Sequence, residues 1–97
     1  MEEKKDYQIL DELYQVILDR REHPKEGSYT CYLWEKGLDK MLKKVGEESA
    51  EVIIGAKNGS RDEVIYETAD LIYHLLVVLA YYGIKPSDIM EELKKRR

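Results

Sequence analysis

Residues 60–83 read SRDEVIYETADLIYHLLVVLAYYG, and this stretch decides the expected fold. Ser60 and Glu63 have the spacing of a capping box, which marks the start of a helix. Gly83 is typical of a helix end. From Val64 to Ala80 the predicted helix is apolar nearly all round. Since a helix of this kind is normally buried, we expect it to form the centre of an all-helical fold.

Three further helices are expected around this central one. The first runs roughly from Lys5 to Glu22 and the second from Glu35 or Leu38 to Lys57, each with apolar residues at helical spacing. Asn58-Gly59 provides a left-handed stop after the second. Pro86 fits the first turn of a short last helix.

The segment HPKEGSYTCYLWEKG, residues 23–37, breaks the helical pattern after the first helix. Pro24 and Gly27 punctuate it, and Ser28 and Thr30 are turn formers, so we predict a loop. The other connections are short, which favours antiparallel neighbours. A chain of 97 residues has a thin core on its own. The sequence therefore predicts an antiparallel bundle of about four helices, completed by homo-oligomerisation.

The composition excludes several classes of protein. Sixteen Lys and Arg against 20 Asp and Glu give a net charge of −4, which argues against general nucleic-acid binding. The N-terminal stretch lacks the apolar core of a signal peptide, and the longest apolar run is shorter than the ~20 residues a bilayer requires. Cys31 is the only cysteine, as expected in a reducing compartment. We expect one cytoplasmic domain over residues 1–97, with no membrane partner.

Acidic residues recur at a spacing of three on the two longest predicted helices. One stripe at the edge of the second helix's apolar face carries Lys44, Glu48, Glu51 and Gly55. The polar residues of the apolar helix share another stripe: Glu63, Glu67, Asp70 and His74. Buried carboxylates become neutral or find a cation. We therefore predict that Glu48, Glu51, Glu67 and Asp70 converge around positive charge, while Gly55 leaves room for a ligand or a close partner helix.

This donor set indicates a particular chemistry. Carboxylate oxygens without cysteine suit a hard cation, Mg²⁺ or Mn²⁺. Protein-bound Mg²⁺ keeps open positions that a phosphate chain can complete. Lys40, Lys43 and Lys44 precede Glu48 by one to two turns and are placed to contact a polyanion. The pattern predicts metal-dependent phosphoanhydride chemistry.

Two short motifs link this pattern to a known family. EESAE at 47–51 and ETAD at 67–70 fit the EExxE…ExxD signature of the all-α NTP pyrophosphohydrolases, which are also called MazG-like. More closely, SYTCYLWEKGLDKMLKKVGEESAEVIIGAKNG with YETADLIYHLLVVL resembles the phosphoribosyl-ATP pyrophosphatases, which catalyse the second step of histidine biosynthesis. The resemblance covers about residues 28–83.

The resemblance implies Mg²⁺-dependent hydrolysis of phosphoribosyl-ATP to phosphoribosyl-AMP and pyrophosphate, in a homodimer or higher assembly. It implies metal ligation by Glu48, Glu51, Glu67 and Asp70. Phosphate contacts are assigned to Lys40, Lys43 and Lys44, and a substrate-facing loop to Ser28, Tyr29 and Thr30. Glu47 or Glu48 is expected to orient or deprotonate the attacking water. Some relatives carry a fused phosphoribosyl-AMP cyclohydrolase domain; here we expect a separate protein to catalyse that next step.

Three other functions are consistent with parts of the pattern. A house-cleaning (d)NTP pyrophosphohydrolase would have the same fold and the same acidic cluster. A di-iron bundle typically carries Glu-x-x-His pairs, which this chain lacks on its acidic stripes. A helical interaction module without catalysis would hold its acids in salt bridges. For His74, a hydrogen-bonded core position and metal ligation are both open.

Overall fold

The computed structural model describes residues 8–97 and is all-helical over this range, which confirms the predicted class. Its helices are α2 (Ile9–Glu22), α3 (Tyr29–Lys36), α4 (Leu38–Lys57), α5 (Arg61–Tyr82) and α6 (Pro86–Lys94). The first predicted helix ends at Glu22 as expected, and its proposed start at Lys5 lies outside the described residues.

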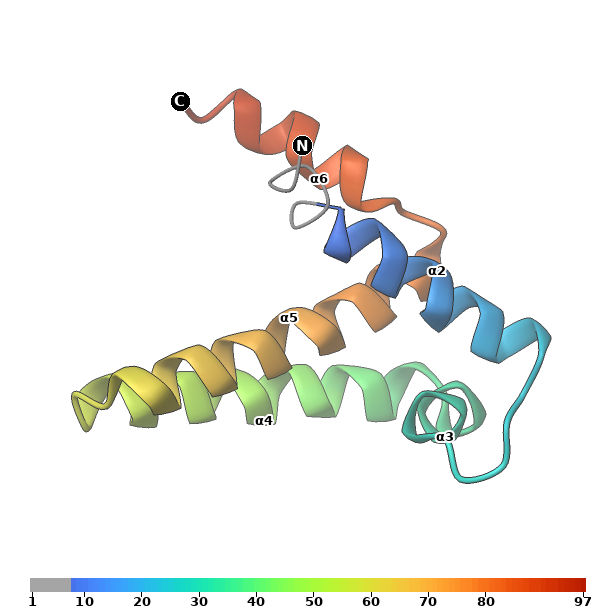
Figure 1. Ribbon diagram of the computed structural model, residues 1–97, viewed down its shortest axis with the longest axis horizontal. Helices are drawn as coiled ribbons and strands as arrows, with labels where there is room; N and C mark the ends of the chain where they lie inside the picture. Colours follow the sequence, from blue (N-terminus) through green and yellow to red (C-terminus); the bar gives the residue numbers. More distant parts are fainter. Residues whose placement is uncertain (1–7) are drawn as a thin grey trace.

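Helices α4 and α5 form an antiparallel hairpin; they lie side by side near the turn and diverge toward the C-terminal end of α5 (Figure 1). Asn58 ends α4, and Gly59 makes the turn at a φ of 69°. The Ser60 hydroxyl then accepts a hydrogen bond from the Glu63 amide at 3.2 Å, which caps α5. Gly83, with a φ of 70°, closes the same helix. The predicted ends of both helices are thus confirmed.

Gly55 brings the two helices of the hairpin close together. It is buried, and a Cβ atom built on it would lie 3.2 Å from the Cβ atom of Glu63. The space left by the missing side chain is therefore filled by a neighbouring helix of the same chain. This is one of the two possibilities, a ligand or a close helix, that the sequence left open.

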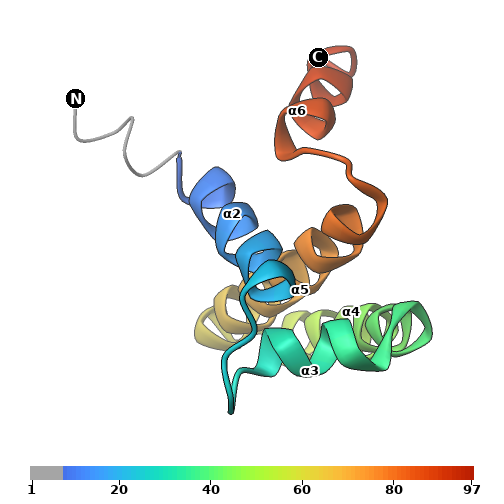
Figure 2. The ribbon, with the colours of Figure 1, turned by 90° about the vertical axis from the view of Figure 1, so that its right-hand side faces the viewer.

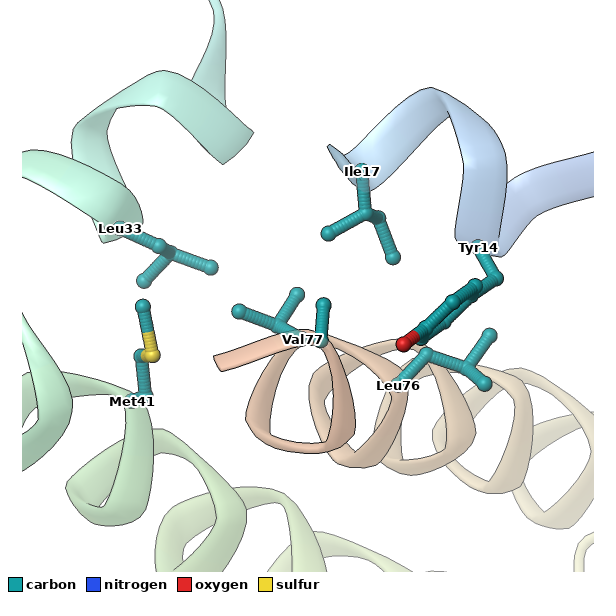
Figure 3. Close-up of a cluster of buried hydrophobic side chains, with 7 residues drawn as sticks. Tyr14, Ile17, Leu33, Met41, Leu76 and Val77 are labelled. Carbon is teal, nitrogen blue, oxygen red and sulfur yellow. The ribbon is translucent and has the colours of Figure 1, made fainter. Parts of the chain in front are cut away.

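The core lies where four helices meet at one end of the hairpin. Helix α2 crosses the C-terminal part of α5, and α3 packs between α2 and the start of α4 (Figure 2). The buried apolar side chains come from all four helices (Figure 3): Tyr14, Ile17, Leu33, Met41, Leu76, Val77 and Ala80.

Helix α3 corrects the prediction of a loop over residues 23–37. Ser28 is its N-cap and accepts a hydrogen bond from the Cys31 amide at 3.2 Å. Leu33 is fully buried, and the Trp34 indole donates to the Ile17 carbonyl at 2.8 Å. Because isolated helices of this length are unstable in water, α3 depends on this docking, which local sequence does not reveal.

Helix α5 is less buried in a single copy than its apolar sequence predicts. Ile65, Ile72 and Leu75 expose 51%, 39% and 42% of their surface, because α2 and α4 cover only part of the helix. Helix α6 points away from the hairpin (Figure 1). The radius of gyration is 14.5 Å, against about 13 Å for a compact domain of this size. The described chain thus forms a hairpin with crossing helices, and a complete four-helix bundle is not formed by one copy.

By length and composition alone, α5 could also cross a membrane. It carries Glu67, Asp70 and His74 along one side. The helix packs on α4 in the part of its length that contains these residues. This is the pattern of a helix at the centre of a helical domain.

Candidate metal and substrate site

The hairpin brings together Glu48 of α4 with Asp70 and His74 of α5. One possible ligand atom from each residue lies within 4.8 Å of the others. The backbone register explains this meeting: Gly55 lies against Glu63, and a step of seven residues along each helix leads to Glu48 and Asp70. Because seven residues make about two helical turns, both side chains return to the same face.

Glu51 and Glu67 occupy the level between these two contacts. Each lies one turn from its partner acid, Glu48 or Asp70, on the same stripe. Glu51 is exposed and Glu67 is half-buried, and neither belongs to the three-donor group. The structure therefore brings Glu48 and Asp70 together directly and leaves the other two acids one turn closer to the turn between α4 and α5.

Burial and a like charge both act on Glu48. The residue is 8% exposed, and burial together with the hydrogen-bonded, negatively charged Asp70 carboxyl raises the pKa of Glu48. The Lys44 ammonium, 3.5 Å from Glu48, acts in the opposite direction without cancelling this effect. The Lys44 ammonium thus does not fully compensate the two neighbouring carboxyl groups of Glu48 and Asp70. A pair of oxygen donors of this kind suits a hard divalent cation.

Lys44 links the site to Glu47. Its ammonium lies 3.1 Å from the Glu47 carboxylate, and this hydrogen bond is the main cause that raises the pKa of Lys44 and lowers the pKa of Glu47. Glu47 is exposed, whereas Glu48 is buried. Of the other candidate phosphate contacts, Lys43 is exposed and Lys40 places its ammonium 6.0 Å from the Tyr32 ring.

The three residues of the predicted substrate loop have different surroundings, because they lie at the start of α3. Ser28 caps this helix, and Thr30 is buried and hydrogen-bonded to the Tyr73 hydroxyl. Tyr29 is 44% exposed, and its hydroxyl bonds to His74 Nε2 at 2.8 Å. Burial is the main cause that raises the pKa of Tyr29, with Lys44 acting against it. Tyr29 is thus the one of the three with a large surface near the acids.

Tyr32 and Tyr73 were not among the predicted site residues. The Tyr29 and Tyr32 rings are stacked with centroids 6.0 Å apart, and Tyr73 lies edge-on to His74 at 5.3 Å. The spacing of aromatic residues within α3 could have indicated the first pair. The second depends on the docking of α3 on α5, for which the sequence has no local signal.

The helical hairpin defines a protein of the all-helical class in which Glu48, Asp70 and His74 could hold a metal ion. A family model described as phosphoribosyl-ATP pyrophosphohydrolase matches residues 10–97. The chain belongs to this family. The resemblance stated from its motifs is therefore confirmed.

Individual relatives agree with this assignment. The phosphoribosyl-ATP pyrophosphatase of Pelotomaculum thermopropionicum is 57% identical over 92% of this chain and 91% of the relative. The enzyme of the same name from Clostridium novyi is 56% identical over 92% of this chain and 81% of the relative. The histidine biosynthesis bifunctional protein HisIE of Thermoanaerobacter pseudethanolicus is 66% identical over 93% of this chain, which spans only 42% of that relative's length.

Proposed function

We propose that this chain hydrolyses phosphoribosyl-ATP to phosphoribosyl-AMP and pyrophosphate, and that it depends on Mg²⁺, with Mn²⁺ as a substitute. The observation that carries the proposal is the buried Glu48 carboxyl beside Asp70 in a chain of this family. The names of the full-length relatives support the substrate. Glu48 and Asp70 would hold the cation, joined by Glu51 and Glu67 from the next level of the hairpin.

When held by Glu48 and Asp70, Mg²⁺ would offer positive charge to the phosphate oxygens as negative charge moves to the leaving group. The Lys44 ammonium lies beside the acids and can contact the phosphate chain, with the adjacent Lys43 and, one turn earlier, Lys40 as further contacts. These cations would align the polyphosphate along α4, with its anhydride bond next to Glu48.

In the reaction, a water oxygen bonds to the α-phosphorus, and the bond from this phosphorus to the bridging oxygen breaks. Pyrophosphate leaves with that oxygen, and a carboxylate takes the proton of the water. Glu47 and Glu48 are the candidates. Glu48 is favoured because it is buried next to Asp70, whereas the exposed Glu47 makes the closer contact with Lys44, at 3.1 Å against 3.5 Å for Glu48.

We also propose that the active form is a cytoplasmic homodimer. A wholly apolar groove of about 190 Å³ separates α5 from α2 and α6, and its lining includes Ile72, Leu75 and Met90, all of them exposed. A second copy would cover this surface and complete a helical bundle. The single cysteine, Cys31, is in keeping with a reducing compartment.

The test is a substrate panel with the purified chain. Phosphoribosyl-ATP, the standard NTPs and the dNTPs are each incubated with Mg²⁺, with Mn²⁺ and with a chelator, and pyrophosphate release is measured. We expect a clear preference for phosphoribosyl-ATP that the chelator abolishes. Preference for a dNTP would instead support a house-cleaning enzyme, and release that is unaffected by chelator would contradict the metal site.

A further inference from the structure

His74 is buried and uses both of its ring nitrogens within the protein. Its exposed fraction is 3%, so it has very little contact with bulk water. Nδ1 lies 2.8 Å from the backbone carbonyl of Asp70, and Nε2 lies 2.8 Å from the hydroxyl of Tyr29. A carbonyl oxygen only accepts, so Nδ1 carries the hydrogen. In the neutral ring, Nε2 then accepts the Tyr29 hydroxyl hydrogen.

This arrangement leaves His74 without a lone pair for a metal ion. Nδ1 is protonated, and the lone pair of Nε2 is taken by Tyr29. The Asp70 carboxylate, in contrast, is 3.6 Å from Nδ1 and 35% exposed, so it is only weakly held by the ring. His74 therefore lies near Glu48 and Asp70 for a reason other than metal ligation.

The bond to His74 fixes the ring of Tyr29. The two rings meet edge-on with centroids 5.6 Å apart, and the Tyr29 ring also stacks with Tyr32. Tyr29 nevertheless exposes 44% of its surface, next to the acids and Lys44. An exposed aromatic ring held in one orientation is a suitable stacking surface for a planar or sugar group.

We propose that His74 is a positioning residue: it holds the Tyr29 ring as a binding surface for the nucleoside part of the substrate and does not ligate the metal. The kinetic part of this inference rests on the proposed function. Loss of the Tyr29–His74 bond frees the ring to rotate, so substrate binding weakens while the carboxylates keep their positions.

Kinetics of matched variants test the positioning role. Tyr29→Phe keeps the ring and removes the bond, and we expect KM for phosphoribosyl-ATP to rise about three- to tenfold with kcat little changed. His74→Phe should have the same effect, and the double variant should be no worse than either single one. His74→Gln retains an acceptor for the tyrosine hydroxyl and should restore most of the affinity.

Tyr73→Phe is the control for stability. This variant removes the hydroxyl that is hydrogen-bonded to Thr30, which is a second side-chain hydrogen bond between α3 and α5. The bond at His74 Nε2 is left in place. We expect both tyrosine variants to lower Tm to a similar extent, with KM raised only in Tyr29→Phe. A rise in KM in both variants would reduce His74 to a purely structural role and overturn the proposal.

Two further measurements do not depend on activity. The chain has two histidines, so ¹⁵N-histidine spectra assigned with His23→Gln report the His74 ring directly. We expect a protonated Nδ1 and an unprotonated Nε2 whose signal moves in Tyr29→Phe. Titration of Mn²⁺ alone, followed by electron paramagnetic resonance, should give similar affinities for the wild type and His74→Gln.

The opposite results would overturn the inference. A protonated Nε2, or a loss of Mn²⁺ affinity of tenfold or more in His74→Gln, would make His74 a ligand or a partner of another kind. If the wild type fails to hydrolyse phosphoribosyl-ATP, the proposed function fails, whereas the spectra and the Mn²⁺ titration still decide the role of His74.

Discussion

Gly55 of α4 and Glu63 of α5 approach so closely that a Cβ atom on the glycine would lie 3.2 Å from the glutamate's Cβ and 3.4 Å from its carbonyl carbon. Both neighbouring atoms belong to the rigid start of a helix. This contact sets the separation of α4 and α5, and it lies two turns from the level at which Glu48 meets Asp70. Any change in the separation is therefore transmitted to the acids.

The variant Gly55→Ala tests this contact. In an exposed helix interior, alanine in place of glycine stabilises by up to about 1 kcal/mol. At Gly55 we expect no such gain, because the methyl group pushes the two helices apart. Urea unfolding measures the difference, and the concentration of Mg²⁺ at half-maximal activity should rise in this variant.

The control for this substitution is Gly46→Ala on the same helix. Gly46 is exposed, and a Cβ atom there meets nothing within 4 Å. We expect the full stabilisation of roughly 0.5–1 kcal/mol. Equal gains at Gly46 and Gly55 would show that the close contact has no energetic effect.

The pair of Glu48 and Asp70 predicts how stability depends on pH. Burial and the neighbouring acid raise the pKa of Glu48 above 4.5, so the folded chain binds its proton more tightly than the unfolded chain. The free energy of unfolding therefore falls as pH rises from about 4.5 through the folded-state pKa. Glu48→Gln removes this dependence, and we expect metal-free Glu48→Gln to be more stable than the wild type at neutral pH.

Urea unfolding of the metal-free protein near pH 4.5 and at neutral pH makes this comparison. Glu47→Gln is a control in which the pH dependence of stability has the opposite sign. The Lys44 hydrogen bond lowers the pKa of Glu47, so the stability that Glu47 contributes is lost as pH falls. Glu47 is exposed, so its effect should be small. A Glu48→Gln variant that is less stable than the wild type at neutral pH would contradict repulsion at this site.

Glu51 tests the extension of the site along the hairpin. If Glu51 joins Glu48 and Asp70 around the cation, Glu51→Gln should lower kcat/KM about a hundredfold or more and leave the helical circular dichroism unchanged. Mg²⁺ should also raise the Tm of the wild type and raise that of the variant much less. Activity and a magnesium-dependent Tm are the two measurements.

Glu63→Gln is the matched control, since Glu63 lies on the acidic stripe of α5 at the far end of the hairpin. Its carboxylate accepts a hydrogen bond from the Asn58 side chain at 3.2 Å, and it has no assigned part in the site. Its activity should stay near that of the wild type. Full activity in Glu51→Gln would limit the site to the Glu48 level.

The C-terminal end of α4, both ends of α5 and the start of α6 could be predicted because each is marked by a local signal. Ser60 caps one helix, and Pro86 starts another at the predicted place. The meeting of Glu48 and Asp70 was also accessible, since a short turn between two long helices fixes the register of the acidic stripes. These features depend on neighbours in sequence or on helical geometry alone.

Other features depend on contacts between distant residues. Helix α3 is stabilised by the burial of Leu33 and by the bond from Trp34 to Ile17, and neither contact has a local signal. The partners of Tyr29 and Thr30 lie more than 40 residues away on α5. The apolar composition of α5 predicts burial without revealing that a single copy supplies too few neighbours.

The exposed side of α5 leads to the last prediction, which concerns the assembly. Ile72 and Leu75 line the apolar groove beside α6, and a charge placed there would be buried at high cost if a second copy covers the surface. We expect the wild type to be a dimer by light scattering and Ile72→Glu to be monomeric with a lower Tm. Gln15→Glu adds the same charge at an exposed position of α2 and should remain dimeric. A wild type that is monomeric at high concentration, or an Ile72→Glu dimer, would mean that this face of α5 is not the interface.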